Sequence, residues 1–322
     1  MIRCSLIVRM ALCAGMLPVG LSVALAEKQT LRYAFKKDAS ASLVMATVGE
    51  STLSVMGKST TVPQAITYHA TVKVAGVDAE GNGTVSVVYD RVLVNFESPV
   101  VATKFDSAAP PEENTPLTQA FAGLVGKEVR LVLTPRGEIR RVEGMKELAD
   151  GLFDPSGYSS DQASRAAKDF VDKALNEDTL RDMMGLYAAI LPAEPVEVGD
   201  TWKSTVTTTK GMPFVADSVY TLKEVTADAV TIGGTSIVRT NESAEPIEFG
   251  GTTLTYKADG NQEFTATIPL SLGVPTKASQ SQDISGEMAM KVPTEPPAVP
   301  QTFNIPVRLK SKTEIVARGN VE

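Results

Sequence analysis

Long stretches of this sequence alternate polar and apolar residues with a period of two, and this pattern constrains the fold more than any other feature. Residues 66–74 are the clearest case, because every second side chain from Ile66 to Val74 is apolar. Successive side chains of a β-strand point to opposite faces, so such a segment buries one face and solvates the other. Comparable strand-like segments occur at residues 31–35, 84–96, 128–133, 138–142, 201–209, 217–226, 230–240, 252–257, 262–270, 287–292 and 303–316. The pattern predicts a mainly β, antiparallel fold.

Turn-forming residues separate several of these segments. Residues 78–83 are rich in Asp, Asn and Gly, and residues 134–137 read Thr-Pro-Arg-Gly, so each set predicts a chain reversal between two strands. Asp259-Gly260-Asn261 predicts another tight turn. Gly233-Gly234 lies inside a strand-like segment and predicts a β-bulge there.

Residues 144–192 have a different pattern, in which apolar residues recur at helical spacing. Two helices are expected in this region, over residues 163–175 and from Asp178 to Pro192. A separate short helix is expected earlier in the chain, over residues 117–125. We therefore predict an α+β fold that is mainly β, with curved antiparallel sheets in two halves bridged by a short helical segment. The predicted regions are an N-terminal β region at 27–143, a helical connector at 144–192 and a C-terminal β region at 193–322.

The first 26 residues have the layout of a secretory signal peptide. Arg3 and Arg9 precede an apolar run, which ends in the small-residue sequence Ala24-Leu25-Ala26. Pro18 and Gly20 interrupt the run before it reaches the roughly 20 apolar residues that a membrane span needs. Cleavage is expected between Ala26 and Glu27, which gives an exported protein, periplasmic or extracellular, with no transmembrane span in the mature chain. Lipidation at Cys13 is disfavoured, because the bulky Leu12 precedes it.

Composition excludes several kinds of chemistry from the mature chain. Both cysteines, Cys4 and Cys13, lie in the predicted signal peptide, so no disulfide, thiolate nucleophile or sulfur ligand remains. Without Arg3 and Arg9 the chain has 29 basic and 38 acidic side chains, which argues against nucleic acid as a partner. A protein partner is not indicated by any motif.

No catalytic, cofactor-binding or metal-binding residue is predicted. His69 is the single histidine, and its place among the polar residues of the 66–74 segment suggests a solvated side chain. The sequence has no Gly-x-Ser-x-Gly elbow and no phosphate-binding glycine loop. Its carboxylates are numerous but none is marked out as a catalytic pair.

The most distinctive segment is Leu191-Pro192 followed by Pro195-Val196-Glu197-Val198-Gly199-Asp200-Thr201-Trp202. It resembles a Leu-Pro…Pro-Val-x-Val-Gly-Asp-x-Trp motif of exported bacterial β-rich proteins that form a domain family of unknown function. The resemblance implies export and a β-rich fold, and no catalytic residues to carry over. From the residues themselves, Gly199 and Asp200 are expected to form a turn, and Trp202 to be a structural anchor at the start of a strand.

Three functions are compatible with these features. The first is a non-enzymatic envelope protein that binds a lipid or other apolar ligand between the sheet and the helices. The second is a structural or interaction protein without a small-molecule ligand, and the third is a carboxylate-dependent hydrolase. The lack of a catalytic set favours the first two.

Overall fold

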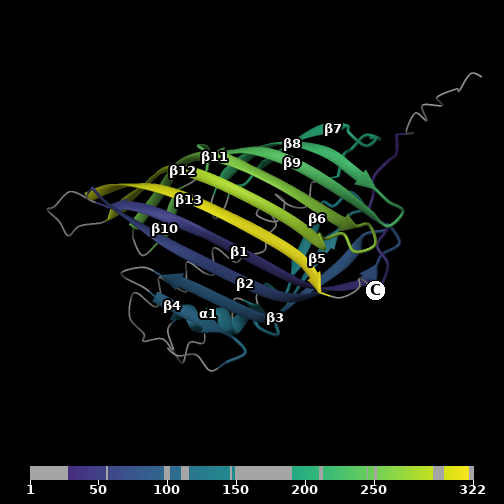
Figure 1. Cartoon of the computed structure of the whole chain (residues 1–322), viewed down its shortest axis with the longest axis horizontal. Helices are drawn as coiled ribbons and strands as arrows, with labels where there is room; N and C mark the ends of the chain where they lie inside the picture. The colour runs from purple at the N-terminus through teal and green to yellow at the C-terminus, as the bar shows by residue number, and fades with distance from the viewer. Residues whose placement is uncertain are drawn as a thin grey trace, which may run out of the picture.

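A computed structural model of the chain describes residues 28–55, 57–97, 102–109, 116–145, 147–148, 191–209, 213–244, 246–249, 252–292 and 301–318. Within these residues thirteen strands form one antiparallel sheet, shown in Figure 1. The strands are β1 (Ser40–Val55), β2 (Lys58–Val77), β3 (Gly83–Glu97), β4 (Ala102–Asp106), β5 (Glu128–Leu133), β6 (Ile139–Glu143), β7 (Thr201–Thr207), β8 (Phe214–Val225), β9 (Ala229–Thr240), β10 (Ile247–Phe249), β11 (Thr252–Pro269), β12 (Lys277–Val292) and β13 (Gln301–Arg318). The helix α1 spans Pro116–Leu124, which confirms the short helix expected over residues 117–125.

The curved antiparallel architecture is confirmed, but its two halves are flanks of a single continuous sheet. The strand order is β6-β5-β3-β2-β1-β13-β12-β11-β9-β8-β7, with β4 beside β3 and β10 beside β11. The flanks meet where β1 pairs with β13, from Ser42↔Arg318 to Leu53↔Val307. Direct backbone pairing therefore joins them. Most of the predicted helical connector, residues 149–190, lies outside the described residues, and the predicted region boundaries stay predictions.

Strand β11 corrects one turn prediction, because it runs without interruption through Asp259-Gly260-Asn261. A Cβ added to Gly260 would lie 2.2 Å from the backbone oxygen of Asp283 on β12. Gly260 therefore allows two strands of a strongly curved sheet to approach each other, which is a different use of glycine from a turn.

The predicted bulge at Gly233-Gly234 is also wrong. Both glycines lie in regular register between β8 and β11, and the irregularity is on β8, between Leu222 and Glu224. A Cβ on Gly234 would lie 2.5 Å from the ring of Phe264. The missing side chain makes room for an aromatic ring on the neighbouring strand.

Residues 31–35 were expected to form a strand and instead form an extended segment outside the sheet. Their alternation still buries Leu31, Tyr33 and Phe35. The amide of Tyr33 donates to the oxygen of Pro135 (2.8 Å), and the amide of Ala34 donates to the oxygen of Leu270 (2.9 Å). The segment thus connects the β5–β6 turn to the β11–β12 turn, which belong to opposite flanks of the sheet.

The main core cluster contains residues from both flanks. Val74, Val85 and Leu131 from the N-terminal flank are clustered with Leu222 and Ile232 from the C-terminal flank. Figure 1 shows how this arises, because the sheet curves until β5 and β6 lie behind the central strands. A second, smaller cluster is formed by Val92, Val94 and Phe105, with α1 residues packed against it. Among the described residues, no helix is both long enough and apolar enough to cross a membrane.

Candidate functional site

The two faces of the sheet differ sharply in charge. We call the face that carries the core clusters the inner face, and the opposite one the outer face. Strand register assigns each residue to one of them, because side chains alternate. The inner-face positions of β1, β9, β11, β12 and β13 hold no Asp, Glu, Lys, Arg or His. The charged residues of these five strands project from the outer face.

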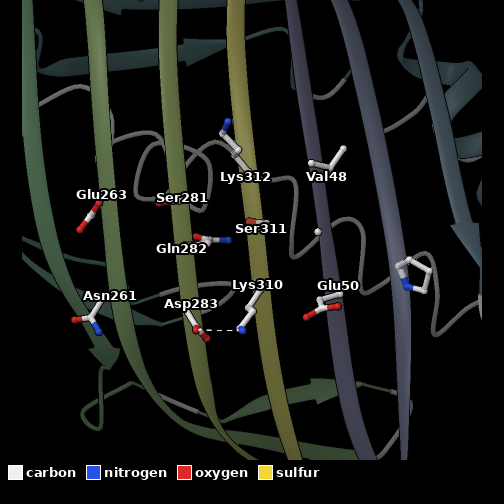
Figure 2. Close-up of a pocket in the computed structure, with 12 residues that line it drawn as sticks. Val48, Glu50, Asn261, Glu263, Ser281, Gln282, Asp283, Lys310, Ser311 and Lys312 are labelled. Atoms are coloured by element: carbon white, nitrogen blue, oxygen red, sulfur yellow. Dashed lines mark ion pairs between the residues drawn. The ribbon is translucent and has the colours of Figure 1, made fainter.

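The outer face carries a shallow hollow of about 660 Å³ over β1, β13, β12 and β11. Figure 2 shows its charged side chains, with Lys310 between Glu50 and Asp283. Asp283 accepts two hydrogen bonds from the Arg308 guanidinium (2.9 and 2.7 Å), which lowers the pKa of Asp283 below 3.8. Lys312 forms an ion pair with Glu314 (2.7 Å). Acids and bases therefore neutralise one another in this hollow.

Two acids of this hollow, Glu50 and Asp283, are not direct neighbours in the sheet. Glu50 lies on β1 and Asp283 on β12, so β13 separates them. Strands are spaced about 4.8 Å apart, which places these two backbone positions about 10 Å from each other. An Asp283 with a lowered pKa also keeps no proton to donate at neutral pH. Within the described residues, no group of three or more acids or histidines is placed to hold a metal ion.

His69 lies on the outer face of β2, opposite Arg91 of β3 and Val44 of β1. Desolvation, and then the positive charges of Arg318 and Arg91, lower the pKa of His69 below 6.5. The imidazole is therefore mostly neutral at pH 7. The outer-face position is the one expected from the alternation of residues 66–74, but the side chain is half-buried, not fully solvated.

A row of small and neutral polar residues crosses the inner face, and we call it the polar belt. Register pairs connect its members strand by strand from β7 to β2. The belt consists of Ser204, Ser218, Ser236, Gln262, Gln282, Ser311, Gly49 and Gln64. This feature is absent from our sequence predictions, because it appears only when the register is known.

The belt has two chemically different parts. At one end the buried hydroxyls of Ser218 and Ser236 hydrogen-bond to each other (2.7 Å). In the middle, Gln262 and Gln282 are direct cross-strand partners. Within the described part of the chain, neither of these amide groups makes a side-chain hydrogen bond, nor does that of Gln64. Each amide retains an unused donor group and an unused acceptor.

The belt divides the inner face into a packed side and a second apolar side. On the packed side Tyr220 and Phe264, which belong to the core cluster or pack on it, stack edge to face with centroids 5.5 Å apart. We call the apolar side chains beyond the belt the distal surface. Its residues are Leu53, Val62, Val238, Leu254, Tyr256, Ile284, Met288, Met290, Phe303, Ile305, Val307 and Leu309. None of them belongs to either core cluster of the described residues.

The distal surface is unevenly covered. Val238 is 7% exposed and Ile305 is 9% exposed, whereas Leu53 is 36% exposed. Most of the remaining side chains are half-buried. Apolar side chains in this state, on a face without charges, can bury further area against an apolar molecule.

The distinctive Leu191–Trp202 segment forms the seam between the two edges of the curved sheet. Gly199 has a positive φ of 96°, and its amide donates to the oxygen of Leu222 (2.8 Å). The Asp200 carboxylate accepts from the amide of Glu197 (3.1 Å) and pairs with Lys28 (3.0 Å), and the pairing with Lys28 lowers the pKa of Asp200. Gly199 and Asp200 thus form a turn fixed against β8.

Trp202 lies on the inner face, in the row next to the polar belt. It is partly buried and packs against the main core cluster, with its ring 5.7 Å from that of Tyr220. The segment from Leu191 to Ser204 lines a hollow of about 510 Å³ together with Arg136 and Glu138 of the β5–β6 turn. The predicted anchors therefore lie beside the β5–β6 turn, at the opposite end of the strand order from β7. Ala26 and Glu27, the predicted cleavage site, lie outside the described residues.

Comparison with known families assigns the chain to a protein family. A model described as a family of unknown function, DUF6263, matches residues 80–275, which is more than half of the sequence. The chain belongs to this family. The Leu191–Trp202 segment lies within the part that matches DUF6263, and the expectation of a domain family without an assigned function is confirmed.

Solved structures give only distant likenesses for this DUF6263 protein. A structure titled "Lipid-protein interactions in lipovitellin" has a TM-score of 0.47 and 9% identity over 88% of this chain, which spans only 25% of the lipovitellin chain. OpdQ from Pseudomonas aeruginosa has a TM-score of 0.22 and 6% identity, over 87% of this chain and 99% of that one. OprD from the same organism has a TM-score of 0.18 and 8% identity, over 92% and 100%. TM-scores this low support no functional argument. The sequence matches no curated protein.

Proposed function

We propose that this DUF6263 protein is a non-enzymatic envelope protein that binds a lipid or other apolar ligand on the distal surface. One observation carries the proposal. The inner face carries no charged side chain on the five consecutive strands β1, β13, β12, β11 and β9, and the apolar side chains beyond the polar belt belong to neither core cluster of the described residues. Burial of such side chains against a ligand contributes roughly 25 cal/mol of favourable free energy for each Å² of apolar area that is removed from water.

Export belongs to the same proposal and is supported by the leader-like layout of residues 1–26. N-terminal sequencing of protein from the periplasm or culture medium tests it, with Glu27 as the expected first residue. A retained leader, or a mature form that starts at Cys13, contradicts the proposal. Cell fractionation then distinguishes periplasmic from extracellular protein.

Ligand binding is tested with the purified mature protein, which is expected to start at Glu27 and so lacks the apolar leader. The uncharged dye N-phenyl-1-naphthylamine should gain fluorescence when it binds, and organic extraction followed by mass spectrometry should recover a bound lipid. Replacing Leu309, on the distal surface, by Ser should weaken dye binding several-fold because the ligand loses apolar contact area. Its sequence neighbour Lys310 points to the outer face, so Lys310→Gln is the matched control and should leave binding unchanged.

Circular dichroism of both variants establishes that they are folded. If the folded wild-type protein neither yields lipid nor binds the dye, the proposal is wrong. That result would favour a structural or interaction protein in which the inner face has no small-molecule ligand.

A further inference from the structure

The absence of inner-face charge on five strands restricts the ligand's head group. A phosphate or carboxylate placed against the inner face would meet no cationic side chain from β1, β9, β11, β12 or β13. Moving an ionised group from water to such a surface without a counter-charge is strongly unfavourable. The cations of these strands lie on the outer face, where Arg308 and Lys312, for example, form ion pairs with acids.

The polar belt disfavours a ligand that has no polar group. A pure hydrocarbon that covered Gln262 and Gln282 would remove their amides from water without replacing the lost hydrogen bonds, which is costly. A ligand with neutral hydrogen-bonding groups would satisfy them. Because an amide both donates and accepts, the glutamines can bind an ester carbonyl as well as a hydroxyl.

The position of the belt fixes the ligand's orientation. Phe264 and Gln280 lie on one side of Gln262 and Gln282, towards the core cluster. The distal surface begins on the other side with Ile284 and Leu309. The polar part of a ligand at the glutamines would therefore direct its chains over the distal surface. Ser218 and Ser236 already satisfy each other, so the free hydrogen-bonding capacity lies nearer the centre of the sheet.

We infer that the ligand is an uncharged lipid with ester and hydroxyl groups, of the acylglycerol type, whose polar groups hydrogen-bond to Gln262 and Gln282 while its acyl chains cover the distal surface. This inference rests on the proposed function and specifies its ligand class. It predicts selection by head-group charge and by hydrogen-bonding capacity, and each can be measured separately.

Displacement of N-phenyl-1-naphthylamine from the mature protein provides the test, with four probes. Dioleoylglycerol should displace the dye at a concentration at least ten-fold lower than oleate at pH 8 or dioleoylphosphatidylglycerol. Hexadecane, which has no polar group, serves as the fourth probe. In Gln262→Leu and Gln282→Leu the affinity for dioleoylglycerol should fall about 2- to 10-fold, as expected for the loss of one neutral hydrogen bond, and the affinity for hexadecane should not fall.

Two outer-face neighbours provide the controls, because Glu263→Gln and Ser281→Ala change residues adjacent to the same glutamines and should leave all four probes unaffected. Equal displacement by the neutral and the anionic lipids would overturn the inference, and so would Leu variants that bind dioleoylglycerol as well as the wild type. In both cases the proposed function would stand. If the folded protein binds neither the dye nor any of the four probes, the proposed function fails, and the inference fails with it.

Discussion

Cooperation between the two flanks of the sheet can be tested with a mutation at one edge and a reporter near the other. Leu131 lies on β5 and is 3% exposed, whereas Trp202, the single tryptophan, lies on the edge strand β7. They are far apart in strand order, but Leu131 belongs to the main core cluster and Trp202 packs against it. Leu131→Ala should therefore destabilise the environment of Trp202.

The expected magnitude follows from burial. Removing most of a leucine side chain from a packed core typically costs 2–5 kcal/mol, and the nearly complete burial of Leu131 places it in this class. The free energy of unfolding should fall by about 2–5 kcal/mol in urea titrations followed by Trp202 fluorescence. Far-UV circular dichroism, which reports on the whole sheet, should show the same shift, because the β1–β13 ladder joins the flanks.

Val77→Ala is the matched control from the same flank. Val77 lies at the end of β2 and is 41% exposed, so its truncation should change stability by no more than about 0.5 kcal/mol. If Leu131→Ala leaves the Trp202 transition in place while circular dichroism reveals a separate, earlier transition, the flanks unfold independently. The two flanks would then not form one cooperative unit.

Three further measurements test other parts of the structure. Gly260→Val should lower the melting temperature and cost about 1–3 kcal/mol, since a Cβ there would lie 2.2 Å from the Asp283 backbone oxygen; an unchanged melting curve contradicts the close strand approach. Hydrogen bonding to Arg91 is the main cause that lowers the pKa of Asp106 from 3.8 to about 2. The ionised carboxylate therefore stabilises the fold above pH 4, and this stabilisation is lost as the pH falls towards 2. The urea midpoint of Asp106→Asn should accordingly depend less on pH than that of the wild type between pH 4 and 2, and parallel profiles would count against the pairing. Trp202 emission should be blue-shifted in the native state, and water-like emission would contradict its packing.

Sequence pattern predicts a strand well where only one face is apolar. Strands β2, β5 and β9 follow this rule. The predicted segments match nearly all of β5 and β9 but less than half of β2. Strand β1 was missed because its outer face also carries apolar residues, namely Val44, Ala46 and Val48, which remove the contrast between the faces. Pairing on both sides, with β2 and β13, holds this strand in the sheet regardless of that contrast.

Long-range pairing is the part of the fold that local pattern does not contain. The β1–β13 ladder joins residues near the two ends of the described chain, such as Ser42 and Arg318. Alternation says which face of each strand is apolar, but many strand orders bury the same faces. The prediction of two halves therefore holds only in part, because the pairing of β1 with β13 makes them flanks of one sheet.

The predicted turn at Gly260 and the predicted bulge at Gly233-Gly234 were wrong for a related reason. Asp259-Gly260-Asn261 has the composition of a turn, and Gly233-Gly234 that of a bulge. Both sets lie within regular strands, where neighbouring chains or rings occupy the space that a Cβ would need. The nearest neighbour of Gly260 is Asp283, and that of Gly234 is Phe264. Both lie more than 20 residues away along the chain, so a short sequence window does not reveal them.

The polar belt separates the ligand-binding hypothesis from the purely structural one. In a solid core, each covered amide of Gln64, Gln262 and Gln282 would need a hydrogen-bonding partner, because an unsatisfied buried polar group costs about 1–3 kcal/mol. The described structure supplies such a partner for the serines at the end of the belt and none for these three amides. Three unsatisfied amides would cost several kcal/mol, a large fraction of the 5–15 kcal/mol that typically stabilises a whole domain. Water or a polar ligand group must therefore reach the centre of the belt, and an apolar surface that begins directly beside such a site suits a molecule with one neutral polar end and one hydrocarbon end.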